Sequence, residues 1–185
     1  MEREYRELLT LTRTLCAKFG PSGWEDAVRE YILQAAMPYA DGMETDPMGN
    51  LMVLRRGRRP AAAGPIMLCA HMDEVGVIVK SFTEDGMVKF GFVGGVDPRV
   101  VIGRRIQFRT EDSDTVEGIV GIKAVHLTTA GERQRAPKTK DLYIDIGCTS
   151  KKQAEDKLSL GDCGTFAPEA VAFGDGLLKA KALDD

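Results

Sequence analysis

The chain has 185 residues, of which 43% are hydrophobic and 29% are charged, and its formal net charge is -3. This balance is typical of a folded globular protein rather than a disordered one. A small negative net charge favours neither nucleic acid nor an anionic membrane as a partner. No stretch approaches the roughly 20 apolar residues that cross a bilayer, and the charged start Met1-Glu2-Arg3-Glu4-Tyr5 lacks the apolar core of a signal peptide.

The four cysteines lie far apart in the sequence and form no Cys-x-x-Cys pair. Cys69 lies inside an apolar run, which predicts a reduced thiol buried in the protein. A reducing compartment suits such cysteines best, so we expect a cytoplasmic protein.

The start of the chain predicts two helices. Apolar side chains at helical spacing indicate a first amphipathic helix, which the turn Phe19-Gly20-Pro21 ends. Ser22 and Glu25 have the spacing of a capping box, so we expect them to begin a second helix. Pro38 marks the end of that helix.

Strands follow these helices. A turn over residues 46–50 leads into a strand at Leu51–Leu54. The basic run 55–59 is expected to be a solvated turn, and a loop over 57–65 precedes the next strand. That strand, residues 66–70, is uninterrupted and apolar, as expected of a strand covered on both faces by helices. The order helix, helix, strand, strand is typical of an α/β fold.

Beyond Val75, short runs rich in β-branched and aromatic residues alternate with turns. The strands expected there cover residues 77–82, 87–92, 104–109, 116–122 and 142–146. One short helix is expected near residues 151–157, with Thr149 or Ser150 as its cap. A small all-β domain of about 90 residues therefore follows the α/β opening.

The predicted fold class is α/β, with a small barrel-like all-β domain inserted into it. Residues 1–74 begin the α/β domain, residues 75–168 form the insertion, and residues 169–185 return to the first domain. Within this last part, residues 177–183 are expected to form the return strand.

His71 and Asp73 directly follow the apolar run 66–70. Ligand sites in open α/β sheets lie at the carboxyl ends of strands. His71 can bind a metal through a neutral imidazole nitrogen. Asp73 can accept a hydrogen bond from the other ring nitrogen and so fix the tautomer. A hydrogen-bonded histidine without a metal is the alternative, and the sequence leaves both open. Glu74 is expected to be an exposed charge.

Asp184 and Asp185 are adjacent carboxylates that again follow a predicted strand. A carboxylate can bridge two divalent cations, and such a metal pair can polarise a carbonyl and activate a water molecule. The alternative is a solvated acidic chain end. His126, the other histidine, lies far along the chain from both candidates, so a structural or interface role is expected for it.

Five motifs occur in the order and spacing of the M42 metallo-aminopeptidases, which the chain resembles over essentially its whole length. The motif around His71 is specific for that family, and the closing Asp-Asp pair is moderately so. The motifs are Ser22-Gly23-Trp24-Glu25, Asp46-Pro47-Met48-Gly49-Asn50, Ala70-His71-Met72-Asp73-Glu74-Val75-Gly76, Asp141-Leu142-Tyr143-Ile144-Asp145-Ile146-Gly147 and Ala182-Leu183-Asp184-Asp185.

The resemblance implies a metallopeptidase catalytic domain in which His71 ligates one metal and Asp184 bridges two. Asp73 would act in catalysis by supporting His71. The family implies two divalent metal ions, zinc or cobalt, and the release of amino acids from peptides with a free N-terminus. It also implies a homo-oligomer that the inserted β-domain helps to build.

The family continues well beyond the Asp-Asp motif, whereas this sequence ends at Asp185. The resemblance implies that a glutamate acting as base and further metal ligands would follow. We therefore expect an N-terminal fragment that is inactive alone and binds metal weakly, since a catalytic zinc takes about three protein ligands. Residues 66–70 should then show apolar surface or an open edge.

Other functions stay open at this stage. A non-catalytic oligomerisation or regulatory module could have arisen from the same family, because the predicted β-domain covers about half of the chain and needs no chemistry to assemble. A glycoside hydrolase is a third possibility, but it needs two carboxylates that flank a sugar cleft. A histidine beside a strand-end aspartate suits a metal better.

Overall fold

The first helix, α1, covers Glu2–Cys16 in the computed structural model, which describes residues 2–57, 64–110 and 114–184. It confirms the predicted amphipathic helix. A second helix, α2, covers Asp26–Ala36 and continues into a single 3-10 turn over Met37–Tyr39. Pro38 lies within that turn, because its fixed φ fits the tighter turn while its missing amide cannot continue the α-helix.

The predicted capping box at the start of α2 is wrong. Glu25 is the N-cap residue and its side chain makes no capping hydrogen bond to the helix. The Ser22 hydroxyl instead donates to Oδ2 of Asp73 at 2.5 Å. Glu25 accepts a hydrogen bond from the amide of Gly23 at 2.7 Å. The Ser22 hydroxyl therefore bonds to a residue 51 positions away and not to the helix that the local spacing predicted.

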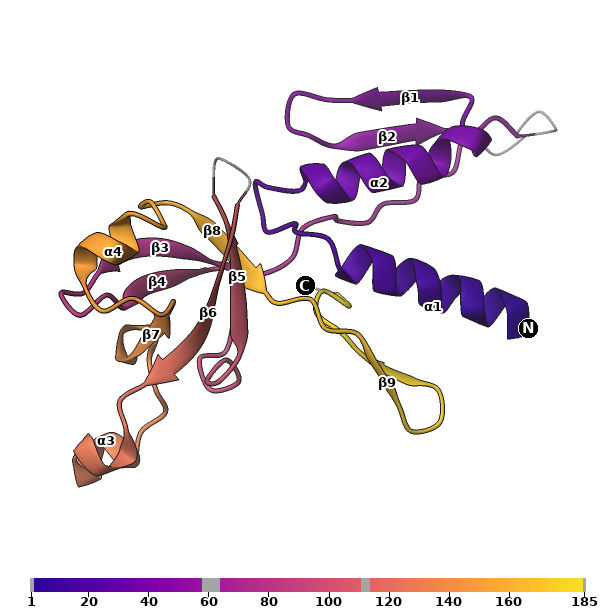
Figure 1. Cartoon of the computed structure of the whole chain (residues 1–185). Coiled ribbons are helices and arrows are strands. Elements are labelled where there is room, and N and C mark those ends of the chain that lie inside the picture. The colour runs from indigo at the N-terminus through magenta and orange to yellow at the C-terminus, as the bar shows by residue number, and fades with distance from the viewer. Residues whose placement is uncertain (1, 58–63, 111–113, 185) are drawn as a thin grey trace.

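A hairpin of β1, Gly42–Thr45, and β2, Leu51–Leu54, follows the helices. Asp46 closes the turn between the strands, since its carboxylate accepts from the amides of Met48 and Asn50, each at 2.9 Å. The predicted turn and strand are confirmed. Figure 1 shows this hairpin lying along α2, apart from the β-domain.

Residues 66–70 do not form the predicted buried strand. Among the described residues none pairs with them as a strand, and Ile66 and Leu68 are 90% and 93% exposed. Cys69 is exposed too, so its predicted burial is also wrong. A strand of this kind is stabilised by neighbours on both sides and helices on both faces. Residues 66–70 therefore show the apolar surface that was expected of a fragment, and the predicted strand is wrong.

Part of the basic run and most of the predicted loop before this segment lie outside the described residues. Arg55 and Arg56 are described and exposed, whereas Arg58 and Arg59 fall in the undescribed stretch.

The middle of the chain closes into an antiparallel β-barrel with strand order β3-β4-β7-β6-β5-β8. The prediction of an α/β opening with a barrel-like all-β domain is confirmed. The strands are β3 Gly76–Phe82, β4 Val88–Val93, β5 Arg105–Arg109, β6 Thr115–Ile122, β7 Leu142–Asp145 and β8 Cys163–Phe166. Closure pairs β3 and β5 with β8, a short strand that the sequence pattern did not reveal.

The barrel encloses the main hydrophobic core, where Ile106, Phe108, Leu142 and Ile144 are fully buried. Gly164 on β8 makes room for two of these side chains. A Cβ atom there would lie 2.8 Å from Cδ1 of Phe108 and 2.9 Å from Cγ2 of Ile106. Glycine is thus needed in β8 because the barrel interior is already filled.

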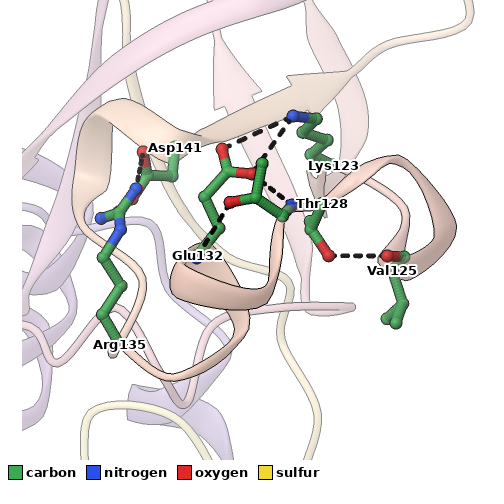
Figure 2. A network of polar contacts seen from close by, with 7 residues as sticks. Lys123, Val125, Thr128, Glu132, Arg135 and Asp141 are labelled. Carbon is green, nitrogen blue, oxygen red and sulfur yellow. Dashed lines mark hydrogen bonds and ion pairs between the residues drawn. The ribbon is translucent and has the colours of Figure 1, made fainter.

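An arm projects from the barrel between β6 and β7 and contains a helix that was not predicted (Figure 1). The arm comprises the 3-10 turn Val125–Leu127, helix α3 at Ala130–Arg133, and the 3-10 turn Thr139–Asp141. Thr129 and Glu132 form a reciprocal capping box on α3. Figure 2 shows how Lys123 reaches Glu132 at 3.5 Å while Arg135 pairs with Asp141 at 2.9 Å.

The short helix predicted near residue 151 is confirmed as α4, Lys151–Glu155, with Ser150 as its N-cap. After β8, strands β9, Val171–Phe173, and β10, Leu177–Lys179, form an antiparallel hairpin. The predicted strand over 177–183 thus ends at Lys179. Within the described part of the chain, no helix is long and apolar enough to span a membrane.

Replacing Phe108 with alanine is expected to lower the free energy of unfolding by about 3–5 kcal/mol, because a fully buried ring would leave a cavity. Urea unfolding followed by circular dichroism measures the change. Leu160→Ala, at an exposed position, is the matched control and should change stability by about 0.5 kcal/mol or less. Equal losses in both variants would contradict a stabilising core inside the barrel.

Candidate functional site

The three residues predicted to form a site lie together in the structure. His71 stands between Asp73 and Asp184, with Nδ1 at 3.1 Å from Oδ1 of Asp73 and Nε2 at 3.5 Å from Oδ1 of Asp184. The imidazole also faces the backbone carbonyl of Asp73 at 3.1 Å from Nδ1. The His71 side chain is 48% exposed, so the site is open to solvent.

Two hydrogen bonds favour the ionised form of Asp73. The Ser22 hydroxyl is the main cause that lowers the pKa of Asp73, and the hydrogen bond from His71 adds to it against the opposing effect of burial. Both Nδ1 contacts of His71 are to oxygen atoms that accept, so we assign the ring proton to Nδ1. On this assignment Nε2 is unprotonated and faces Oδ1 of Asp184 at 3.5 Å.

Glu74 is not the exposed charge that the sequence predicted. Its side chain is 5% exposed, and Oε1 accepts from Nζ of Lys181 at 2.5 Å and from the amide of Gly20 at 3.1 Å. Its own amide donates to the carbonyl of Gly20 at 2.9 Å. A buried carboxylate needs such partners because it loses its hydration.

Lys181 fixes the end of the described chain against this buried carboxylate. Its side chain is 6% exposed, and Nζ donates to the carbonyl of Lys18 at 2.6 Å as well as to Glu74. The next residue, Ala182, has a φ of 51°, a left-handed conformation that a residue with a Cβ seldom adopts. The thiol of Cys16 lies 3.7 Å from the Ala182 carbonyl. These contacts set where Asp184 emerges, two residues further on.

The donor atoms suit part of a metal site. Imidazole nitrogen and carboxylate oxygen both bind zinc and related divalent ions. In the ranges 2–57, 64–110 and 114–184, however, no group of three or more histidine, cysteine, aspartate or glutamate side chains could hold a metal ion. Among the described residues, His71 and Asp184 bring one nitrogen and one carboxylate donor together. His126 belongs to the exposed turn Val125–Leu127 on the arm.

The sequence predicted a site at His71, Asp73 and Asp184, which the structure brings together, but it missed the residues that hold them in place. Lys181 carried only one signal, its alternation with Lys179 in a segment expected to be a strand. Ser22 was assigned to the wrong partner. Neither error could be corrected locally, because both partners lie more than 50 positions away along the chain.

Comparison with known proteins gives a consistent result. The family model described as M42 glutamyl aminopeptidase matches residues 49–185. A putative aminopeptidase of Acetivibrio thermocellus is 32% identical over 98% of this chain and 51% of its own length. The lysyl aminopeptidase of Pyrococcus furiosus is 30% identical over 90% of this chain and 47% of its own length. The chain spans about half the length of the curated relatives it matches.

Solved structures with the same fold agree with these relatives. An aminopeptidase from Desulfurococcus kamchatkensis has a TM-score of 0.84 at 30% identity, over 98% of this chain and 48% of that one. The TET1 peptidase of Pyrococcus horikoshii, which can assemble into a tetrahedron or a large octahedral shell, has a TM-score of 0.72 at 31% identity over 86% and 46%. A Thermotoga maritima protein described as an endoglucanase has a TM-score of 0.69 at 33% identity over 86% and 45%.

Replacing Lys181 with methionine is expected to lower the free energy of unfolding by about 3–5 kcal/mol, because it leaves the buried carboxylate of Glu74 without its counter-charge. Chemical denaturation measures the loss. Adding Glu74→Gln to Lys181→Met should recover most of it, since the unpaired charge is then gone.

Lys179→Met is the matched control for this experiment. Lys179 pairs with Glu169 at 2.5 Å, but both side chains are about half exposed, so its loss should cost about 1 kcal/mol or less. If Lys181→Met were no more destabilising than Lys179→Met, the buried pair of Glu74 and Lys181 would contribute no more to stability than an exposed pair.

Proposed function

Because the chain belongs to the M42 glutamyl aminopeptidase family, we propose that it supplies the first part of the active site of a metal-dependent aminopeptidase. One observation carries this proposal. His71 directs Nε2 toward the carboxylate of Asp184, while Asp73 occupies its other ring nitrogen. We propose that His71 and Asp184 are metal ligands and that Asp73 supports His71.

Each of these side chains has a defined task in the proposed site. Asp73 holds the proton on Nδ1 of His71, which leaves Nε2 unprotonated, as a metal ligand must be. The Ser22 hydroxyl donates a hydrogen bond to Asp73, which orients the carboxylate and lowers its pKa. Asp184 presents a carboxylate with two oxygens, enough to contact two cations at once. Bound zinc or cobalt ions would polarise a peptide carbonyl and activate a water molecule.

Further groups are needed to complete this chemistry. Two protein ligands are fewer than the three that a catalytic zinc takes, and a base must accept the proton of the attacking water. In the proposed enzyme these groups come from polypeptide that also covers the exposed segment 66–70. Its substrates would be peptides with a free N-terminus. The cysteines of the described residues are all unpaired, which supports a reducing, cytoplasmic location.

We also propose that the complete protein is a homo-oligomer. The arm of the barrel exposes Val125 and Leu127 on a scaffold held by ion pairs (Figure 2). Exposed apolar side chains on a projection are typical of an interface between subunits. The shells formed by the TET1 peptidase of Pyrococcus horikoshii support this proposal.

The endoglucanase description of one structural relative does not favour a glycosidase. A glycosidase needs its two carboxyl groups on opposite sides of a sugar, at a separation set by the mechanism. Here Asp73 and Asp184 both contact the single imidazole of His71. That arrangement orients a histidine, so it supports the metallopeptidase.

The metal ligands are tested by titrating the purified chain with Zn²⁺ and Co²⁺ in a calorimeter. We expect weak binding, with a dissociation constant on the order of micromolar or higher, because only two ligands are provided. His71→Ala should weaken binding by roughly tenfold or more. His126→Ala is the matched control, since it removes the other histidine from an exposed turn, and should leave the affinity unchanged.

Equal losses in the two histidine variants would mean that binding is nonspecific and that His71 is not a ligand. Tight binding of two ions, abolished by His71→Ala, would show that the chain completes a dinuclear site by itself. The proposal of an incomplete ligand set would then be wrong.

The purified chain is expected to release no amino acids from peptides with a free N-terminus when Zn²⁺ or Co²⁺ is added. No base for the attacking water lies among His71, Asp73 and Asp184, which are occupied with ligation and orientation. Release of the N-terminal residue is followed by chromatography, with an N-acetylated peptide as the control. Metal-dependent release that disappears in Asp184→Asn would contradict the expected inactivity.

A further inference from the structure

The proposed function uses only Ser22 of the motif Ser22-Gly23-Trp24-Glu25, yet the backbone around this motif has a defined shape. Residues 21–24 form a tight turn, which is closed by a hydrogen bond from the amide of Trp24 to the carbonyl of Pro21 at 2.8 Å. Gly23, at the third position of the turn, has a φ of 89°. This combination is typical of a type II turn, whose third position favours glycine because a Cβ atom is strained there.

This turn carries the Ser22 hydroxyl to the candidate site. Ser22 occupies its second position and donates to Oδ2 of Asp73 at 2.5 Å. Glu25 braces the turn from the following residue, since its side chain accepts from the amide of Gly23 at 2.7 Å. Ser22 is itself exposed. The place of its hydroxyl therefore depends on the backbone of the turn and on the residues that hold the two ends.

The first end of the turn is fixed to the segment that contains Asp73. Pro21 is fully buried and forms a parallel β-bridge with Glu74. The preceding residue, Gly20, exchanges two hydrogen bonds with Glu74: its carbonyl accepts from the Glu74 amide at 2.9 Å, and its amide donates to Oε1 at 3.1 Å. A Cβ atom on Gly76, where β3 begins, would lie 3.0 Å from Cβ of Pro21. The chain before Ser22 thus packs closely against the entry to the barrel.

The second end of the turn is fixed to the barrel itself. Cys163 on β8 is 6% exposed, and burial raises the pKa of its thiol, while a hydrogen bond from the Trp24 side chain acts in the opposite direction. The indole N–H can only donate, so the thiol is the acceptor. A large ring with a polar N–H holds a chain segment well when one side is covered and the other is wet. Trp24, which is 37% exposed, has this intermediate position.

We infer that Gly23 and Trp24 are positioning residues for the proposed metal site. Gly23 allows the backbone of the turn, and Trp24 ties that turn to β8. Together they keep the Ser22 hydroxyl on Asp73 and, through Asp73, the proton of His71 on Nδ1. The inference deepens the proposed function and rests on it, because an imidazole protonated at Nδ1 can bind a metal only through Nε2.

The test follows the ¹⁵N chemical shifts of the imidazoles by NMR in the purified full chain, with chelator and without metal. The pH is held well above the ordinary pKa of histidine, so that the shifts report which ring nitrogen carries the proton. His126, the other histidine, is the internal reference. Gly23→Ala should move the Nδ1 and Nε2 shifts of His71 toward each other, as Ser22→Ala should, because the two tautomers then mix. The added Cβ meets nothing within 4 Å, so this variant acts through the positive φ alone.

Gly147→Ala is the matched control for Gly23→Ala. Gly147 follows β7, has a φ of 73° and also leaves open space for a Cβ atom. Its replacement should lower the urea midpoint about as much as Gly23→Ala does and leave the His71 shifts unchanged. Gly23→Asn should keep the wild-type shifts, because asparagine adopts a left-handed backbone more readily than alanine. Equal movement in Gly147→Ala, or no movement in Gly23→Ala, would overturn the inference.

The role of Trp24 is tested separately. It is the only tryptophan in the chain, so a red shift of its emission in Gly23→Ala would show that the ring has left its place at Cys163. Trp24→Ala should move the His71 shifts in the same direction as Gly23→Ala. Tyr39→Ala, which removes an aromatic ring that is 69% exposed, should not. Unmoved His71 shifts in Trp24→Ala would overturn the assignment of Trp24.

Failure of this inference is distinguishable from failure of the proposed function, because the NMR test contains no metal. In calorimetry with Zn²⁺, Gly23→Ala should weaken binding by about tenfold, whereas Gly147→Ala should not change it. Zinc binding that depends on His71, with unmoved shifts in Gly23→Ala, would overturn the positioning role alone. Shifts that move as expected in a chain whose zinc binding ignores His71 would support the turn and contradict the metallopeptidase.

Discussion

The buried ion pair between Glu74 and Lys181 is the interaction on which the candidate site depends. Taking both charges out of water is costly, and only close pairing with further hydrogen bonds offsets that cost. Glu74 meets this need through the amide of Gly20, and Lys181 through the carbonyl of Lys18. The segments that contain Gly20, Glu74 and Lys181 are distant in sequence and must therefore meet at one point. His71 and Asp184 lie three residues from Glu74 and Lys181, so these contacts also bring them close together.

The barrel provides the fixed surface against which these segments are arranged. Its closure leaves no free edge, and its core of Phe108, Leu142 and their neighbours keeps the strands in register. The connection between β4 and β5 and the chain after β8 extend from this barrel and lie on the same cavity. Asp184 lines the same cavity from the chain that follows β10. Asp184 thus belongs both to the candidate site and to the wall of this cavity.

Local patterns predicted much of the fold and failed where the partner was distant. Alternation and helical spacing found α1, α2 and most strands of the barrel, because those elements are stabilised by their own periodic faces. The segment 66–70 has the composition of a buried strand, yet such a strand exists only when neighbours pair with it. The helix α3 was missed because four residues carry too little periodicity.

The sequence by itself determined the residue types of the site and their order, since a histidine and aspartates after apolar runs carry the chemistry of metal ligands. It also determined the family resemblance, the α/β opening and the all-β insertion. Only the tertiary structure decided that Asp184 lies against His71, that Ser22 holds Asp73, and that Glu74 is buried. The physical reason is that these contacts join segments 51 to 113 positions apart, where packing and desolvation act and local spacing carries no information.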